Sequence, residues 1–199
     1  VLLPVAVLST SLFALCAALL TIWWLAKWGV LLLSGQTQGI LFILVIGAAT
    51  DYSLLLVARY REELRVTQDA WQACWKALKG SVEPIVASGG TVIAGLLTLT
   101  LSDLKSNSTL GPVTAIGIVF AMVSALTLLP AILVLFGRTA FWPKRPLYEP
   151  EAVAADHSGA SSGLWARIFR LLGRRPRTAW AVTTVVLLAG ALGLAQLKA

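Results

Sequence analysis

Charged residues are scarce in this chain of 199 residues: they make up 13% of the sequence, whereas hydrophobic residues make up 58%. A soluble domain carries about 25% charged residues. The scarcity of charge therefore excludes an ordinary soluble domain and predicts a polytopic membrane protein. Helices satisfy their own backbone hydrogen bonds in lipid. The expected fold class is thus an all-α bundle of transmembrane helices.

Cysteine, histidine and methionine are also rare. We place Cys16 within a span and Cys74 in a cytoplasmic loop, so a disulfide is not expected, and two separate thiols make no metal site. His157, the one histidine, lies in a polar segment and is interpreted as a solvated loop residue. No metal and no cofactor are expected. The one methionine, Met122, and the start at Val1 within an apolar run indicate a piece of a longer protein.

Apolar runs long enough to cross a bilayer, which takes about 20 residues, occur five times. Pro84 falls in the first turn of the third run, where a missing N–H costs little. Pro130 lies deep in the fourth run and is expected to kink it. The predicted spans are residues 3–26, 38–58, 82–101, 112–136 and 178–197.

Basic residues account for the net charge of +7, and they are unevenly distributed. Five lie within residues 59–79 and eight within residues 138–177. The positive-inside rule explains this asymmetry without a nucleic-acid partner. It predicts that both segments are cytoplasmic and that the loops on the opposite side are short. A multi-pass protein of the plasma membrane is the expected location.

The two basic segments differ in their predicted structure. Residues 68–79 show helical spacing of apolar positions and are expected to form a helix of their own before the third span. Residues 138–177 are interpreted as a cytoplasmic linker, in which residues 164–174 form a basic amphipathic helix suited to the membrane interface. The linker separates two membrane bundles in this interpretation. Residues 1–137 then hold four spans, and residues 178–199 open a second bundle.

Asp51, followed directly by Tyr52, is the residue in the apolar runs that most needs an explanation. It lies eight positions before Arg59, which places it about 12 Å deep along the helix axis. An ionised carboxylate at that depth costs at least about 2.5–3.5 kcal/mol, and such residues usually serve ion, proton or substrate traffic. Loss of water disfavours the charged form, so Asp51 is suited to load and release a proton. The Tyr52 hydroxyl can both donate and accept a hydrogen bond.

Small and polar residues around this pair complete the candidate site. Ser88 and Thr91 on the third span are candidate hydrogen-bond neighbours of the pair. Small residues let membrane helices approach closely, and they recur at helical spacing on three spans. The alternatives are that Asp51 pairs with a basic or hydroxyl group to lock the bundle, and that Tyr52 only packs. The predicted helix-packing glycines are Gly47, Gly90, Gly95 and Gly117.

One string resembles the signature of the MMPL family of transporters, in the resistance-nodulation-division superfamily: Gly47-Ala-Ala-Thr-Asp-Tyr-Ser-Leu-Leu-Leu-Val-Ala-Arg-Tyr-Arg-Glu-Glu-Leu64. Residues 127–131 (Thr-Leu-Leu-Pro-Ala) and 141–145 (Phe-Trp-Pro-Lys-Arg) look like the family too. The resemblance covers residues 1–146. It implies two homologous halves of six spans, each with a large outer domain after its first span. On that template this chain runs from the third to the seventh span.

The resemblance also implies a function. In the family, an Asp-Tyr pair forms a proton relay with a matching pair from the second half, so Asp51 and Tyr52 take those roles by resemblance. Family members use the proton gradient to export lipids and other hydrophobic molecules across the plasma membrane. The implied partners are the lipid bilayer, the missing second half and a hydrophobic substrate. A homo-oligomer is left open.

Two other classes of protein compete with the exporter. A sterol-sensing or scaffold bundle of related fold would bind lipid without pumping it. An intramembrane aspartyl protease would need two carboxylates sharing one site, but the chain has one mid-membrane aspartate, and Asp103 lies at the outer rim. We therefore do not expect an enzyme.

Overall fold

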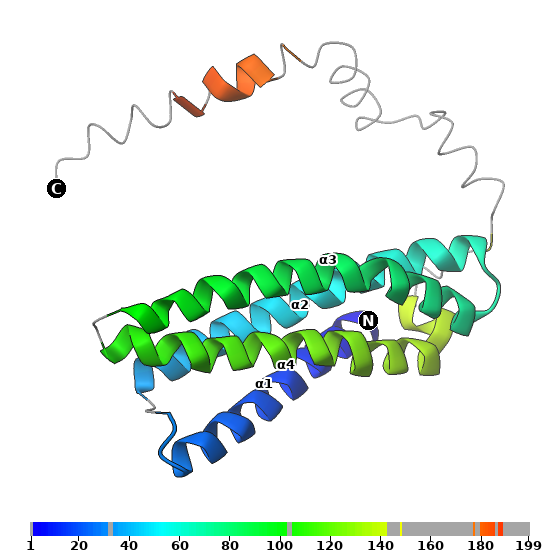
Figure 1. Cartoon of the computed structure of the whole chain (residues 1–199). Coiled ribbons are helices and arrows are strands. Elements are labelled where there is room, and N and C mark those ends of the chain that lie inside the picture. The colour runs from blue at the N-terminus through cyan, green and yellow to red at the C-terminus, as the bar shows by residue number, and fades with distance from the viewer. Residues whose placement is uncertain are drawn as a thin grey trace. The chain divides into compact units, whose positions relative to one another are not determined.

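The computed structural model describes residues 2–31, 34–102, 105–142, 148, 177, 180–185 and 187–188, without the side chains of 105–107. The chain divides into two compact units, residues 1–150 and 151–199. The first unit holds four long helices and two short 3-10 helices (Figure 1). They are α1 (Leu2–Lys27), α2 (Gly35–Val66), α3 (Ala70–Thr98), η1 (Leu99–Leu101), α4 (Lys105–Phe136) and η2 (Gly137–Phe141).

Each of the four long helices is long and apolar enough to span a membrane. The described residues of the chain contain helices but no strand, so the all-α bundle predicted from the sequence is confirmed. Of the fifth predicted span, only residues 180–185 and 187–188 are described, and they are helical. Of the predicted linker, 138–177, the described residues are 138–142, 148 and 177; its amphipathic helix at 164–174 and His157 lie outside them.

Helix α3 corrects the expected boundary between a cytoplasmic helix and the third span. The two are one continuous helix, in which Pro84 lies in the interior rather than in a first turn. The N-cap is Asp69, whose carboxylate accepts a hydrogen bond from the Trp71 N–H at 3.1 Å. Gly80 lies within this continuous helix, beside the end of the Arg59 side chain of α2. A glycine costs a helix interior about 1 kcal/mol, and this one does not end the helix.

Cys74 is a second correction, because it belongs to the core rather than to a loop. It lies on α3 and is buried. Its thiol donates to the backbone oxygen of Pro130 on α4 at 3.8 Å. Helix α4 begins at Lys105, seven residues before the predicted start, and stays α-helical through Pro130.

Helix α4 packs against the other three long helices (Figure 1). Gly117 permits this packing: a Cβ at that position would lie 2.5 Å from Val45 Cγ2 on α2. Around this contact, one cluster of buried residues includes Leu41, Val45, Tyr52 and Ile85. A second cluster lies nearer the end where α2 meets α3 and includes Leu56, Tyr60, Leu64 and Leu133.

Hydrogen bonds from side chains to the backbone fix the end of the bundle where α2 meets α3. Arg138 donates from Nη2 to the backbone oxygens of Leu64 at 2.8 Å and Thr67 at 3.0 Å. These carbonyls belong to the last turn of α2 and the residue after it, where intrahelical donors are missing. Gly137 has a φ of +51°, a conformation that favours glycine, and it turns the chain immediately before Arg138.

Candidate functional site

Asp51 and Tyr52 are neighbours on α2 that face different surroundings. Asp51 is exposed, whereas Tyr52 is only 8% exposed and belongs to a core cluster. The difference follows from the rotation of about 100° between successive helical residues. The carboxylate therefore faces away from the core of this unit, and the phenol ring anchors the same turn inside it.

The carboxylate side of α2 is hollowed. A cavity of about 620 Å³ lies there, lined by residues of α2, α3 and α4. Asp51 is the one charged residue in the lining, Tyr52 and Ser88 are its other polar residues, and the rest are apolar or glycine. No lysine or arginine belongs to it, so the described part of the chain offers no cation beside the carboxylate at this hollow. Gly47 and Ala48 of α2, Ser88 of α3 and Ile118 of α4 belong to this lining.

The two candidate hydrogen-bond neighbours of the pair are placed differently. Ser88 lines the same hollow as Asp51, and its hydroxyl donates to the Ile85 carbonyl of its own helix at 3.1 Å. Thr91 is exposed, is not part of the lining, and donates to the Ala87 carbonyl at 2.8 Å. The geometry thus brings Ser88 to the hollow of Asp51 and leaves Thr91 outside it.

The four predicted packing glycines also separate into two groups. Gly117 lies against Leu41 and Val45 of α2. Gly47, Gly90 and Gly95 would meet no described atom within 4 Å if they carried a Cβ. Whatever packs on these three glycines lies outside the described residues, and their role in helix packing stays a prediction.

Two features beside Asp51 were not found by sequence reasoning. The hydroxyls of Ser11 on α1 and Thr50 on α2 lie 3.2 Å apart, so a hydrogen bond joins the two helices one residue before Asp51. The hydroxyl of Ser53, two residues after Asp51, is buried and has no hydrogen-bond partner among the described residues. Isolated hydroxyl residues in separate apolar runs gave no signal for either feature.

The described part of the chain contains no group of three or more His, Cys, Asp or Glu side chains that could hold a metal ion. The chemistry available at the hollow is that of a single carboxyl group, a phenol one residue away and a serine hydroxyl on the neighbouring helix. Such groups can exchange protons and hydrogen bonds.

Four membrane-length helices form this unit, and one of them, α2, carries a carboxylate midway along its length. These features define a multi-pass membrane protein of the helical-bundle class. The chain belongs to the MMPL family, whose family model matches residues 1–179. It is 49% identical over 189 residues to a putative membrane protein of Streptomyces coelicolor. The aligned residues cover 95% of this chain and 26% of that protein.

Two relatives have names that state a transported compound. The sulfolipid-1 exporter MmpL8 of Mycobacterium tuberculosis is 35% identical over 164 residues, covering 80% of this chain and 14% of that protein. The apo-petrobactin exporter of Bacillus anthracis is 37% identical over 126 residues, covering 63% of this chain and 17% of that protein. The chain therefore spans about a quarter or less of the length of these relatives. No solved structure matches the chain significantly.

Proposed function

We propose that this chain forms part of the membrane domain of an exporter. The proton-motive force drives this exporter to move lipids or other hydrophobic compounds across the plasma membrane. Membership of the MMPL family supports transport, and so do the two relatives named as exporters. Transport rather than catalysis also fits a site with one carboxylate, because an aspartyl protease needs two.

The observation that carries the proposal is the position of Asp51. Asp51 lies within a membrane-length helix, and it is the one charged residue in the lining of the hollow beside that helix. An ionised carboxylate costs several kcal/mol there, and protonation removes that cost. In this proposal the carboxyl group takes a proton from one side of the membrane and releases it to the other.

Tyr52 is the second residue of the proposed relay, and the open side of the hollow leaves room for a matching pair. Tyr52 is held in the core of this unit, so its backbone fixes the turn that carries Asp51. The small residues Gly47 and Ala48 line the hollow beside the carboxylate and leave room for another helix. We propose that the second half of the exporter covers this side and brings a matching pair to Asp51.

The test is export by the full-length protein in cells, with Asp51→Asn as the variant. Asn keeps the shape of the side chain but cannot carry a proton, so export should fall to background. Glu83→Gln is the matched control, because Glu83 is an exposed acid on α3 outside this lining. Wild-type export by Asp51→Asn would reject the relay. Lipid binding without export, by both the wild-type protein and Asp51→Asn, would favour the scaffold alternative.

A further inference from the structure

A long apolar groove follows the contact between α3 and α4, away from Asp51. It consists of two cavities of about 320 and 350 Å³ that share Leu126 and Thr127. The first extends to Trp71 at the start of α3 and the second to Ile93 near its end. We call this feature the α3/α4 groove. Its length along the helix axes, from position 71 to position 93, is about 33 Å at 1.5 Å per residue.

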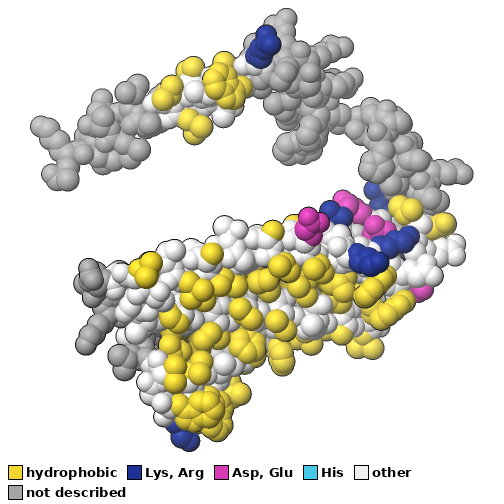
Figure 2. All heavy atoms as spheres, in the orientation of Figure 1, with side chains coloured by type: hydrophobic (Ala, Val, Ile, Leu, Met, Phe, Trp, Pro, Cys, Tyr) yellow, Lys and Arg dark blue, Asp and Glu magenta, His cyan; other side chains and the backbone are white. Residues whose placement is uncertain are grey.

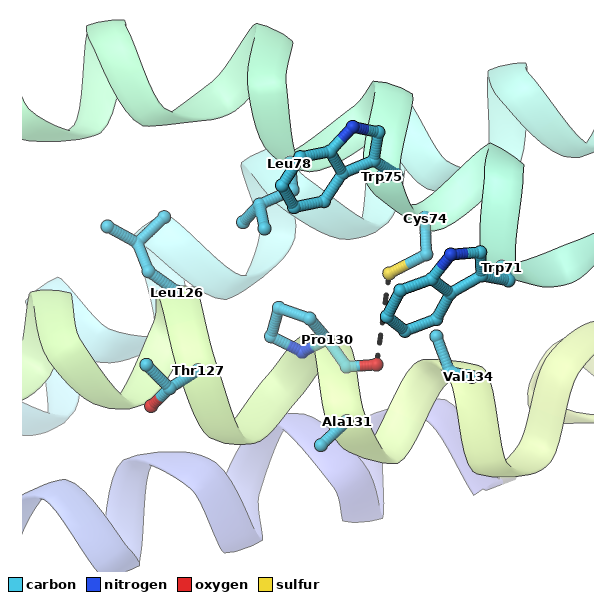
Figure 3. A pocket seen from close by; sticks show the side chains of 9 residues that line it. All are labelled: Trp71, Cys74, Trp75, Leu78, Leu126, Thr127, Pro130, Ala131 and Val134. Carbon is cyan, nitrogen blue, oxygen red and sulfur yellow. Dashed lines mark hydrogen bonds between the residues drawn. The ribbon is translucent and has the colours of Figure 1, made fainter.

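The wall of the α3/α4 groove is apolar, and its largest side chains, two tryptophans, lie at one end (Figure 3). The indole rings of Trp71 and Trp75 lie on the α3 side, opposite Pro130 on α4. The two tryptophans are 63% and 52% exposed. Tryptophan is enriched at the headgroup level of membranes, which places this end of the groove at the membrane surface.

The same end carries acidic as well as basic side chains, and one cation, Lys79, lies against the groove wall. Lys79 Nζ lies 5.7 Å from the centre of the Trp75 ring, one helical turn further along α3. On the face shown in Figure 2, charged side chains gather at the end where α2 and α3 join, and apolar side chains cover the middle of the unit. A headgroup at this end would meet an ammonium group, whereas a chain in the groove would meet apolar side chains, Cys74, Met122 and one threonine.

From these observations we propose that the α3/α4 groove binds one anionic phospholipid of the adjacent leaflet. One acyl chain lies in the groove along α3 and α4, and the headgroup lies at the end lined by Trp71 and Trp75, with its phosphate within reach of Lys79 Nζ. The complementarity is between an acyl chain and an elongated apolar groove, and between a phosphate and an ammonium group. Basic groups near an anionic lipid surface contribute about 1 kcal/mol each.

A transmembrane helix is the competing occupant, and the lining argues against it. Membrane helices pack through small residues. The hollow at Asp51 offers such residues, Gly47 and Ala48. The headgroup end of the α3/α4 groove instead has the long side chains of Trp71, Trp75 and Leu78 along its α3 wall, opposite the smaller Thr127 and Ala131 of α4.

The experiment is native mass spectrometry of the full-length protein, released from nanodiscs of phosphatidylglycerol or phosphatidylcholine with identical acyl chains. We expect one retained phosphatidylglycerol and preferential retention of it over phosphatidylcholine. Lys79→Gln should lower that preference about fivefold, from the contribution of one basic residue. Lys76→Gln is the charge-matched control, because Lys76 Nζ donates to the Thr67 hydroxyl at 3.3 Å, whereas Lys79 Nζ lies over the Trp75 ring of the lining. An unchanged preference in Lys79→Gln would overturn the headgroup assignment.

The acyl-chain assignment has its own variants. Ala131→Phe and Thr127→Phe each fill the groove from the exposed side of α4 and should lose the retained lipid. Leu135→Phe adds an equal ring to an exposed position outside the lining and should keep it. Retention of the lipid by both filled variants would overturn the proposal. So would a disulfide between Thr127→Cys and a cysteine placed in another transmembrane segment, because a protein helix would then occupy the groove.

Discussion

Asp51 and Tyr52 are consecutive residues, yet the carboxylate lies on the open side of α2 while the phenol ring is buried in the core. The ring therefore has two separable contributions. Its carbon atoms fill the core of this unit, and the residue also lines the hollow of Asp51, where a phenol hydroxyl can form hydrogen bonds. Substitutions at position 52 can distinguish packing from the proposed relay.

Tyr52→Phe should leave the folded protein intact and reduce proton-driven export, because it removes the hydroxyl and keeps the ring. Tyr52→Ala should also lower the free energy of unfolding by about 3 kcal/mol, as expected for deleting a buried aromatic ring. Thermal unfolding and export by the full-length protein measure the two effects. Wild-type export by Tyr52→Phe would leave Tyr52 with a packing role only.

Gly117 should tolerate no larger side chain. Gly117→Leu places carbon atoms where Leu41 and Val45 of α2 already lie, and such overpacking costs about 1–3 kcal/mol. Gly39→Ala is the control, since a Cβ at Gly39 meets no described atom within 4 Å. Unfolding measurements should show a loss of stability for Gly117→Leu alone. Equal stability of both variants would contradict the packing of α4 on α2.

Arg138 should stabilise the last turn of α2. Arg138→Ala removes charge-assisted hydrogen bonds to the carbonyls of Leu64 and Thr67 and should cost about 2 kcal/mol. Arg61→Ala removes a basic residue from the same region at an exposed position and should change stability by less than about 0.5 kcal/mol. Hydrogen exchange at the end of α2 should increase in the first variant, and unchanged exchange there would contradict the capping role.

Cys74 should be protected from labelling although charged residues surround it in the sequence. In a variant whose only cysteine is Cys74, a membrane-impermeant maleimide should react slowly until the protein is unfolded, because the thiol is buried against Pro130. Arg61→Cys in a cysteine-free background supplies the exposed comparison. Equal labelling rates at the two positions would show that α3 does not pack on α4 at this level.

Long apolar runs predicted the four helices well, because lipid leaves helices as the only way for such runs to satisfy their backbone. The start of α3 could not be placed from composition. The charges between Arg59 and Lys79 resemble those of a loop, and the helix nevertheless runs from Ala70 through Gly80 into the span. Burial of Cys74 likewise depends on α4, which is distant in the sequence.

The candidate site was predicted to a similar extent. An acidic residue within an apolar run singles out Asp51 without a structure, because its energetic cost requires an explanation. Sequence spacing alone could not show that Ser88 reaches the hollow of Asp51 and Thr91 does not, since that depends on how α3 is rotated against α2. The hydrogen bond between Ser11 and Thr50 depends equally on the packing of α1.

Proton flux tests the central claim most directly. The full-length protein in proteoliposomes, with an imposed pH gradient and a pH-sensitive dye inside, should show proton movement that accompanies export. Asp51→Asn should abolish both, and Glu83→Gln should keep both. Proton-coupled export that persists in Asp51→Asn would contradict the account.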